Sequence, residues 1–231
     1  PTGGFQYGGI LVSNGDIGLP GVDDVKHAKN STGNTHGSLI EINGKYYIFY
    51  HRHSNRKQSS RQACAEEIRF ENGKFFQAEM TSCGLNNSPL NGTGHYPSYI
   101  ACNVYGKKGT RFLSMLKHPK MGHPYLTQKG GDRESGEDQY VAHMCDGAVA
   151  GYKYFDLSET KEIRINICGN ARGTVYIRTE ENGKPVASIQ VKAGRERKNF
   201  SAKLAGLGKK EALFFCYEGK GSFDFHAFDL K

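Results

Sequence analysis

The chain has 231 residues, of which 37% are apolar, and its formal net charge is +8. This length suffices for one large domain or two modest ones. The chain has no apolar run long enough to cross a membrane, and its basic residues alternate with acidic ones without forming a block, so we expect neither membrane nor nucleic-acid binding. Gly supplies 30 residues and Tyr and Phe 13 each, without helical periodicity, which favours an all-β protein.

The six cysteines show neither a Cys-x-x-Cys pair nor the spacing of a metal site. We expect them to be small buried side chains. Dispersed thiols favour a reducing cytoplasm, with an extracellular location if a signal peptide precedes this sequence. The chain begins with Pro1 and not with Met, so we expect an upstream part.

The first half of the chain alternates apolar strands with tight turns. Asn43-Gly44 and Asn72-Gly73 each favour a type I′ turn, because both residues tolerate positive φ, and so predict two hairpins. The predicted strands cover residues 39–42, 46–50, 62–70 and 75–80. Four antiparallel strands in this length are typical of one β-propeller blade.

A polar segment rich in Gly and Asn, residues 83–94, predicts a boundary between a domain of residues 1–83 and one of residues 84–231. In the second domain Ile163, Ile165 and Ile167 alternate with polar residues, as in a half-buried strand. Further strands are predicted at residues 173–179, 186–191, 199–204, 212–217 and 222–230. The predicted fold is therefore all-β, with a partial β-propeller, about one blade plus an extra strand, followed by a β-sandwich or jelly roll.

Six motifs in this order resemble known sequences. Residues 7–16, 34–38 (Asn-Thr-His-Gly-Ser) and 45–52 (ending in Tyr-His-Arg) resemble the last part of the five-bladed propeller of glycoside hydrolase family 43, which includes arabinofuranosidases and xylosidases. Residues 124–128, 138–141 and 146–155 resemble a module similar to carbohydrate-binding family 6. Together the two resemblances cover nearly the whole chain.

The propeller resemblance implies roles for several residues. His36 matches a histidine in the central channel that helps to hold a calcium ion or its waters, although His is an unusual calcium ligand and a hydrogen-bonded strand residue is the alternative. Arg61 matches an arginine that reaches the sugar pocket, and the alternative is a surface Arg paired with Glu66 or Glu67. His51, Arg52 and His53 follow the second strand, and we expect them to border the pocket.

The catalytic carboxylates are expected upstream of Pro1. Inverting glycosidases need a general acid and a general base, and the resemblance implies that this family carries its carboxylates on the first three blades. Asp16, Asp23 and Asp24 match no catalytic motif and are predicted to be solvated loop residues. Since one blade cannot bury its faces alone, residues 1–83 are expected to need the missing blades, in cis or in trans, or to form an appendage on the sandwich.

In the second domain, Tyr140 and Tyr152, together with Tyr154 and Phe155, are candidate platforms for a sugar ring, with a core position as the alternative. Asp224 matches an acidic residue that contributes to a structural calcium site in similar modules. A solvent-facing position is the alternative for Asp224.

Three functions remain open from the sequence. The first is a glycosidase acting on arabinose- or xylose-containing plant polysaccharides or oligosaccharides, of which this chain is the C-terminal portion. The second is a non-catalytic carbohydrate-binding protein, and the third is a structural or protein-interaction domain.

Overall fold

The computed structural model describes residues 2–107, 109–110, 123–130 and 139–231. Throughout these ranges the regular structure consists of strands and two short 3₁₀ helices, η1 (Asn14–Asp16) and η2 (Ser98–Ile100), which confirms the all-β prediction. No helix among the described residues has the length and apolarity to span a membrane. Asp138, part of one of the motifs above, lies outside the described residues.

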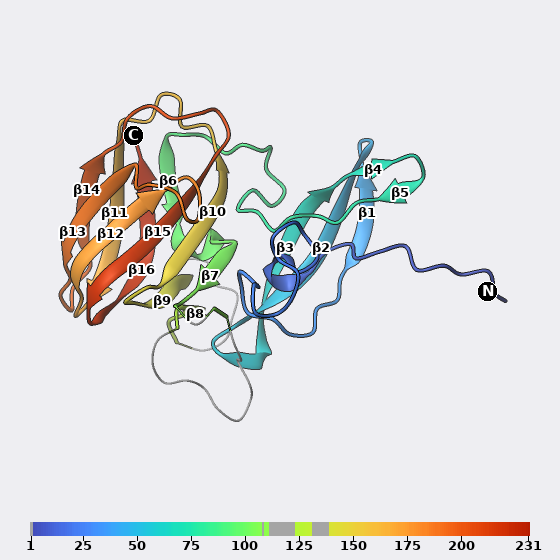
Figure 1. The fold of residues 1–231 in the computed structure, drawn as a ribbon, viewed down its shortest axis with the longest axis horizontal. Helices are drawn as coiled ribbons and strands as arrows, with labels where there is room; N and C mark the ends of the chain where they lie inside the picture. The colour runs from blue at the N-terminus through green and yellow to red at the C-terminus, as the bar shows by residue number, and fades with distance from the viewer. Residues whose placement is uncertain (1, 108, 111–122, 131–138) are drawn as a thin grey trace.

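The first half of the chain contains a three-stranded antiparallel sheet in the order β1-β2-β3 (Figure 1). Its strands are β1 (Ser38–Ile42), β2 (Lys45–Ser54) and β3 (Lys57–Ile68), and a separate two-stranded hairpin joins β4 (Phe70–Glu71) to β5 (Lys74–Phe75). Both Asn-Gly turns have positive φ at both positions, as predicted, with values of 53° and 78° for Asn43 and Gly44. Of the predicted fourth strand, residues 75–80, only Phe75 pairs in a β-ladder, as the last residue of β5. The backbone beyond it pairs with the N-terminal segment instead, because the Ala78 amide donates to the Leu11 carbonyl at 2.8 Å.

A third tight turn joins β2 to β3 and was missed in the sequence. Asn55 and Arg56 both have positive φ, 53° and 52°, where a polar loop was predicted. The turn packs on the sandwich, since the Asn55 amide donates to the Leu126 carbonyl at 2.8 Å and the Arg56 guanidinium lies 3.8 Å from the centre of the Tyr125 ring. This tertiary contact, which the sequence does not reveal, stabilises the unusual turn.

The second half of the chain is the predicted β-sandwich. One sheet has five strands in the order β13-β12-β15-β10-β7, and the other has six, β14-β11-β16-β9-β8 with β6 paired to β16. The strands are β6 (Gly94–Pro97), β7 (Asn103–Tyr105), β8 (Tyr125–Gln128), β9 (Gln139–Cys145), β10 (Val149–Phe155), β11 (Glu162–Gly169), β12 (Arg172–Arg178), β13 (Ala187–Lys192), β14 (Lys198–Lys203), β15 (Glu211–Lys220) and β16 (Ser222–Leu230).

The sandwich core lies between the inner faces of these two sheets. Ile163, Ile165 and Ile167 all point inward and are at most 1% exposed, as their alternation predicts. Phe215 and Phe228 pack between the sheets with tilted rings whose centres are 5.1 Å apart. Each such side chain contributes about 1.5–3 kcal/mol by its burial, so the sandwich has the apolar core of a self-sufficient domain. All six cysteines are free.

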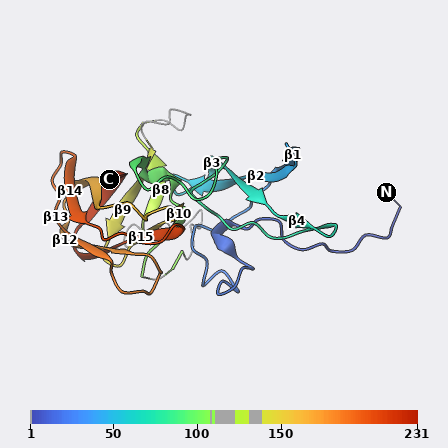
Figure 2. The ribbon, with the colours of Figure 1, turned by 90° about the horizontal axis from the view of Figure 1, so that it is seen from above.

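The three-stranded sheet lies beside the sandwich, and the N-terminal segment reaches away from both (Figures 1 and 2). The connecting segment packs along β10 of the sandwich: the Ser82 amide donates to the Lys153 carbonyl at 2.6 Å and the Leu90 amide to the Tyr154 carbonyl at 2.8 Å. The two parts are thus joined by ordered backbone hydrogen bonds and not by a loose linker.

A buried ion pair crosses the same interface and corrects one prediction. The Lys153 ammonium lies 2.8 Å from Glu79 Oε1 and 3.4 Å from Asp16 Oδ2. Asp16 is 2% exposed, so it is not the solvated loop carboxylate that the sequence suggested, and burial raises its pKa. Asp23 and Asp24 are exposed, as predicted.

Candidate functional site

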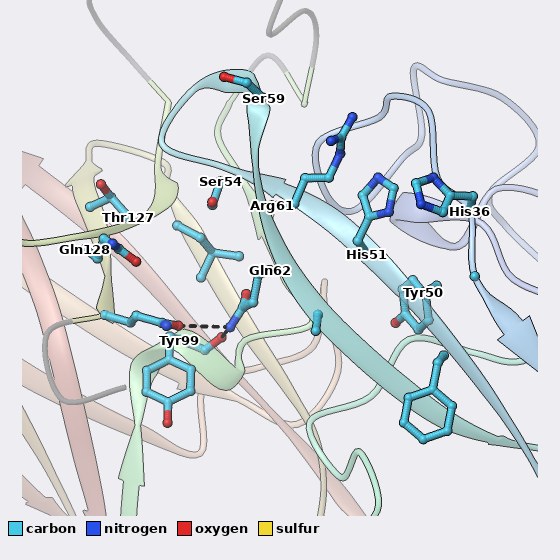
Figure 3. A pocket seen from close by; sticks show the side chains of 15 residues that line it. His36, Tyr50, His51, Ser54, Ser59, Arg61, Gln62, Tyr99, Thr127 and Gln128 are labelled. Carbon is cyan, nitrogen blue, oxygen red and sulfur yellow. Dashed lines mark hydrogen bonds between the residues drawn. The ribbon is translucent and has the colours of Figure 1, made fainter. Parts of the chain in front are cut away.

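A cavity of about 840 Å³ lies where the three-stranded sheet meets the sandwich (Figure 3). On the blade side, the ends of β2 and β3 and the segment before β1 line it. On the sandwich side, the lining comes from η2, β8 and the start of β9. The size is that of a typical small-molecule site.

Strand alternation brings the predicted blade residues together on one side of this cavity. His51 lies opposite Ala63 and His53 opposite Arg61 in the β2–β3 ladder, so these side chains share one face of the sheet. The His36 ring meets the His51 ring edge-on, with ring centres 4.6 Å apart. Figure 3 shows His36, His51 and Arg61 pointing to the same side. The structure therefore groups three residues that are far apart in the sequence.

The two buried histidines of this group have lowered pKa values. Burial lowers the pKa of both His51 and His53, and the positive charge of Arg61 lowers them further. Each Nε2 lies 3.1 Å from an oxygen of Asn34, the carbonyl for His51 and the side-chain oxygen for His53, so each imidazole donates to it. The lowered pKa values favour the neutral imidazoles of His51 and His53 beside the permanent cation of Arg61.

Arg61 is exposed at the cavity and is not held by an acidic neighbour. In the part of the chain that the structure describes, no carboxylate pairs with it, since Glu67 pairs with Lys45 at 2.9 Å and Glu66 accepts hydrogen bonds from Thr81. The alternative of a surface arginine paired with Glu66 or Glu67 is therefore wrong. The guanidinium is available to bind oxygen atoms in pairs.

Arg52 points to the opposite face of the sheet and is 4% exposed. Its guanidinium donates to the carbonyls of Tyr99, at 2.7 Å, and Ala101, and to the Gln62 side chain at 2.8 Å. The expectation that Arg52 borders the sugar pocket is corrected, because Arg52 does not line the cavity and its two terminal nitrogens donate to carbonyls of the sandwich side. Arg52 fastens the blade to η2.

The residues that line the cavity on the sandwich side are not among those predicted from the sequence. Gln62 donates to the Gln139 side-chain oxygen at 3.2 Å across the interface, and the Thr127 hydroxyl donates to Asn55 Oδ1. Tyr99 completes this side. No motif signals these residues, because the cavity wall arises only when β8, β9 and η2 dock on the β2–β3 hairpin.

The two tyrosines predicted to stack on a sugar, Tyr152 and Tyr140, differ in burial. Tyr152 is fully buried, its hydroxyl donates to the Ser98 carbonyl at 3.0 Å, and its ring packs on Phe215 and Phe228. It is a core residue, which corrects the prediction that it stacks on a sugar. Tyr140 is half-buried, with its ring centre 4.7 Å from that of His226, and its role as a platform stays a prediction.

The two predicted metal ligands lie in different parts of the molecule. His36 is exposed beside His51, and Asp224, on β16, accepts a hydrogen bond from the His143 amide at 3.1 Å. The described residues contain no cluster of three or more His, Cys, Asp or Glu side chains suited to a metal ion. Calcium takes roughly six to eight oxygen ligands. A calcium ion held by His36 or by Asp224 therefore stays a prediction.

Comparison with known proteins gives one strong sequence relative. The chain is 41% identical, over its whole length, to a protein of Thermoclostridium stercorarium named xylosidase/arabinosidase, and it spans 49% of that relative. No family model matches the chain. The chain thus spans about half the length of the curated relative that it matches.

Two solved structures are similar in fold. A family 43 arabinoxylan arabinofuranohydrolase from Bacillus subtilis, solved with cellotetraose, matches the entire chain with a TM-score of 0.56 and 16% identity, and the chain covers 45% of it. A family 6 carbohydrate-binding module from Clostridium cellulolyticum, solved with xylose, aligns with 62% of the chain with a TM-score of 0.47 and 12% identity, over 99% of that module. The predicted resemblance to family 43 glycoside hydrolases is confirmed.

Proposed function

We propose that this chain, which resembles family 43 glycoside hydrolases, supplies one propeller blade and an attached sandwich to an inverting glycosidase of arabinose- or xylose-containing plant saccharides. The observation that carries the proposal is the 41% identity to a xylosidase/arabinosidase along the full chain. The cavity that Arg61 shares with His36 and His51 supports it, since the family resemblance implies that Arg61 reaches the sugar pocket.

The chemistry of the cavity suits sugar binding but not, by itself, hydrolysis. Imidazole rings, amides and one unpaired guanidinium can hold hydroxyl groups. Among the described lining residues there is no Asp or Glu. An inverting mechanism needs two carboxyl groups roughly 6.5–9.5 Å apart with water between them. We therefore propose that the general acid and base come from other blades, and that Arg61 orients a sugar hydroxyl or the acid.

The open face of the blade supports the same proposal. Every residue of β1 is exposed, and Ile40 and Ile42 are 47% and 42% exposed. Apolar side chains gathered on one sheet mark an interaction surface. We propose that neighbouring blades of the propeller, in cis or in trans, cover this face. Calcium at the centre stays a prediction, because most of its ligands would have to come from those blades.

The test compares residues 1–231 with the protein produced together with the sequence that precedes them in the gene. We expect the longer protein to release nitrophenol from nitrophenyl arabinofuranoside or xyloside, and residues 1–231 to release none. Arg61→Ala in the longer protein should lower kcat/KM about 10- to 100-fold, since a hydrogen bond to a charged group contributes about 1.5–3 kcal/mol. Arg195→Ala, at an exposed position on the sandwich, is the matched control and should have no effect.

Hydrolysis by residues 1–231, abolished by changing one of their own Asp or Glu side chains, would contradict the proposal. The cavity without carboxylates favours one second candidate, a non-catalytic carbohydrate-binding protein. Affinity for xylan or arabinan without hydrolysis by the longer protein would identify it. A stable complex with another protein and no affinity for sugar would instead indicate an interaction domain.

A further inference from the structure

A second cavity, of about 740 Å³, adjoins the first and shares part of its lining. Tyr99 and Gln139 line both cavities. The second cavity lies on the outer face of the six-stranded sheet, because Asn166, which lines it, alternates with the core residues Ile165 and Ile167. The two cavities therefore meet at η2 and the start of β9.

We propose that these cavities form one continuous path for a linear, uncharged polysaccharide backbone, which runs from the His36–Arg61 group across Tyr99 and Gln139 onto the six-stranded sheet. The inference rests on the proposed function for the class of ligand. It assigns the sandwich a direct part in holding the same substrate chain as the blade, and it makes Tyr99 the residue that joins the two halves of the path.

Tyr99 is held rigidly at this junction. Its carbonyl accepts hydrogen bonds from Arg52 at 2.7 Å and from Gln62 at 3.4 Å on the blade side. The preceding Ser98 hydroxyl donates to the Phe225 carbonyl of β16 and accepts from the Val141 amide at 3.0 Å. A backbone anchored on both sides fixes the position of the Tyr99 main chain, which lowers the ordering cost of binding.

The Tyr99 ring packs against the sandwich core and is only partly covered by it. Its ring is half-buried, and among the described residues its hydroxyl has no hydrogen-bond partner. Figure 3 shows the ring pointing away from the group formed by His36, His51 and Arg61. A fixed aromatic ring with a free hydroxyl offers both a stacking face and a polar contact to a sugar.

The second cavity also has the chemistry that hydroxyl groups require. Asn166 donates to the Asn199 side-chain oxygen at 2.7 Å, which leaves further amide donors and acceptors on this face. His226 is neutral at pH 7, because burial and the Arg197 charge lower its pKa to about 4. The guanidiniums of Arg61 and Arg197 belong to different cavities and do not form a cluster suited to phosphate.

The shared lining and the sizes indicate an extended ligand. Each cavity alone falls within the range of a small-molecule site, roughly 300–1,000 Å³. Two such cavities with a common wall at Tyr99 and Gln139 fit a chain of sugar units better than a single one. A linear backbone of the xylan type meets this requirement.

Calorimetric titration of the longer protein with xylobiose and xylohexaose tests the inference. Xylohexaose should bind with one molecule per chain and more tightly than xylobiose. Tyr99→Ala should weaken xylohexaose binding about tenfold, which corresponds to about 1.4 kcal/mol, and xylobiose binding by less than about twofold. Tyr99→Phe, which keeps the ring, should stay within about twofold of the unchanged protein for both sugars.

Tyr176→Ala is the matched control, because Tyr176 is a half-buried tyrosine on the five-stranded sheet, on β12. Circular dichroism should show that each variant folds. Two xylohexaose molecules per chain, equal losses for both sugars in Tyr99→Ala, or no binding of either sugar would overturn the inference. If Tyr99→Ala in the longer protein binds xylohexaose as tightly as the unchanged protein, the continuous path is overturned. If the longer protein still releases nitrophenol in that case, the proposed glycosidase function stays intact.

Discussion

The sandwich and the blade bury their apolar surfaces in different ways. In the sandwich two sheets cover each other, and the aromatic and aliphatic residues between them are almost completely buried. In the blade one face packs on the N-terminal segment through Ile48 and Ile68, whereas Ile40 and Ile42 stay exposed. The sandwich therefore has an apolar core of its own, whereas the described part of the blade leaves one apolar face uncovered, as we propose for a blade that needs its neighbours.

The contact between the two parts combines a small apolar cluster of Tyr50, Met80 and Cys102 with buried charged groups. Charged side chains cross it in both directions: Arg52 of the blade binds carbonyls of the sandwich, and Lys153 of the sandwich reaches Asp16 and Glu79 of the blade. Such buried pairs contribute little compared with apolar packing, but removing one partner is costly. The following substitutions test this contrast between apolar packing and buried charges, from the largest expected effect to the smallest.

Replacing Lys153 with Met should have the largest effect on stability. The variant leaves the Asp16 carboxylate, 2% exposed, buried without its cation. We expect the free energy of unfolding to fall by about 3–5 kcal/mol in urea titrations. Adding Asp16→Asn to Lys153→Met should restore part of the loss, because the uncompensated charge is then gone.

Lys107→Met is the control for this change, since Lys107 pairs with Asp146 on the exposed surface. It should leave stability unchanged within error. Equal losses from Lys107→Met and Lys153→Met would show that the interface has no special dependence on its buried pair.

The buried Glu66 carboxyl in the blade should make the free energy of unfolding depend on pH. Burial raises its pKa from 4.5 to about 7, although Thr81 donates two hydrogen bonds to it. Between these values the native state binds more protons than the unfolded chain, so this group's contribution to stability is complete below pH 4.5 and is lost as the pH rises through 7. We expect the unfolding free energy of the unchanged chain, relative to Glu66→Gln, to fall by about 2–3 kcal/mol from pH 4.5 to 7.5.

Urea titrations of both proteins across this pH range measure the difference, and the shared histidines cancel in the comparison. Glu41→Gln, at an exposed position on β1, is the matched control and should leave the pH profile unchanged. A constant difference between Glu66→Gln and the unchanged protein would show that the Glu66 carboxyl titrates normally.

The smallest expected effect distinguishes a core tyrosine from a sugar platform. Tyr152→Phe removes only the hydroxyl that donates to the Ser98 carbonyl, so stability should fall by about 1 kcal/mol. Affinity for xylo-oligosaccharides should not change, because the ring is fully buried. A loss of sugar affinity in a variant of full stability would restore Tyr152 as a platform.

The sequence predicts local features of this protein well and tertiary ones poorly. The Asn-Gly turns and the alternation of Ile163 to Ile167 follow from local conformational preference and side-chain period, and the structure confirms them. Whether Asp16 is solvated depends on a lysine 137 positions away, which no local pattern encodes.

In the candidate site, too, some residues could be predicted from the sequence and others could not. The resemblance assigned His36 to the central channel and Arg61 to the sugar pocket, and His51 was expected to border that pocket; the structure brings all three to one cavity, and their roles stay predictions. Arg52 directly follows His51, yet strand alternation turns it to the other face, where the sandwich binds it. Tyr99 and Gln139 escape prediction because they reach the cavity only through domain docking.

Hydrogen exchange tests the central claim, that the blade is incomplete without neighbours and the sandwich is not. The measurement compares β1 and β2 with β11 and β16 in residues 1–231 and in the longer protein. We predict that β11 and β16 are equally protected in both, and that β1 and β2 become strongly protected only in the longer protein. Full protection of β1 in residues 1–231 alone would contradict this account of the molecule.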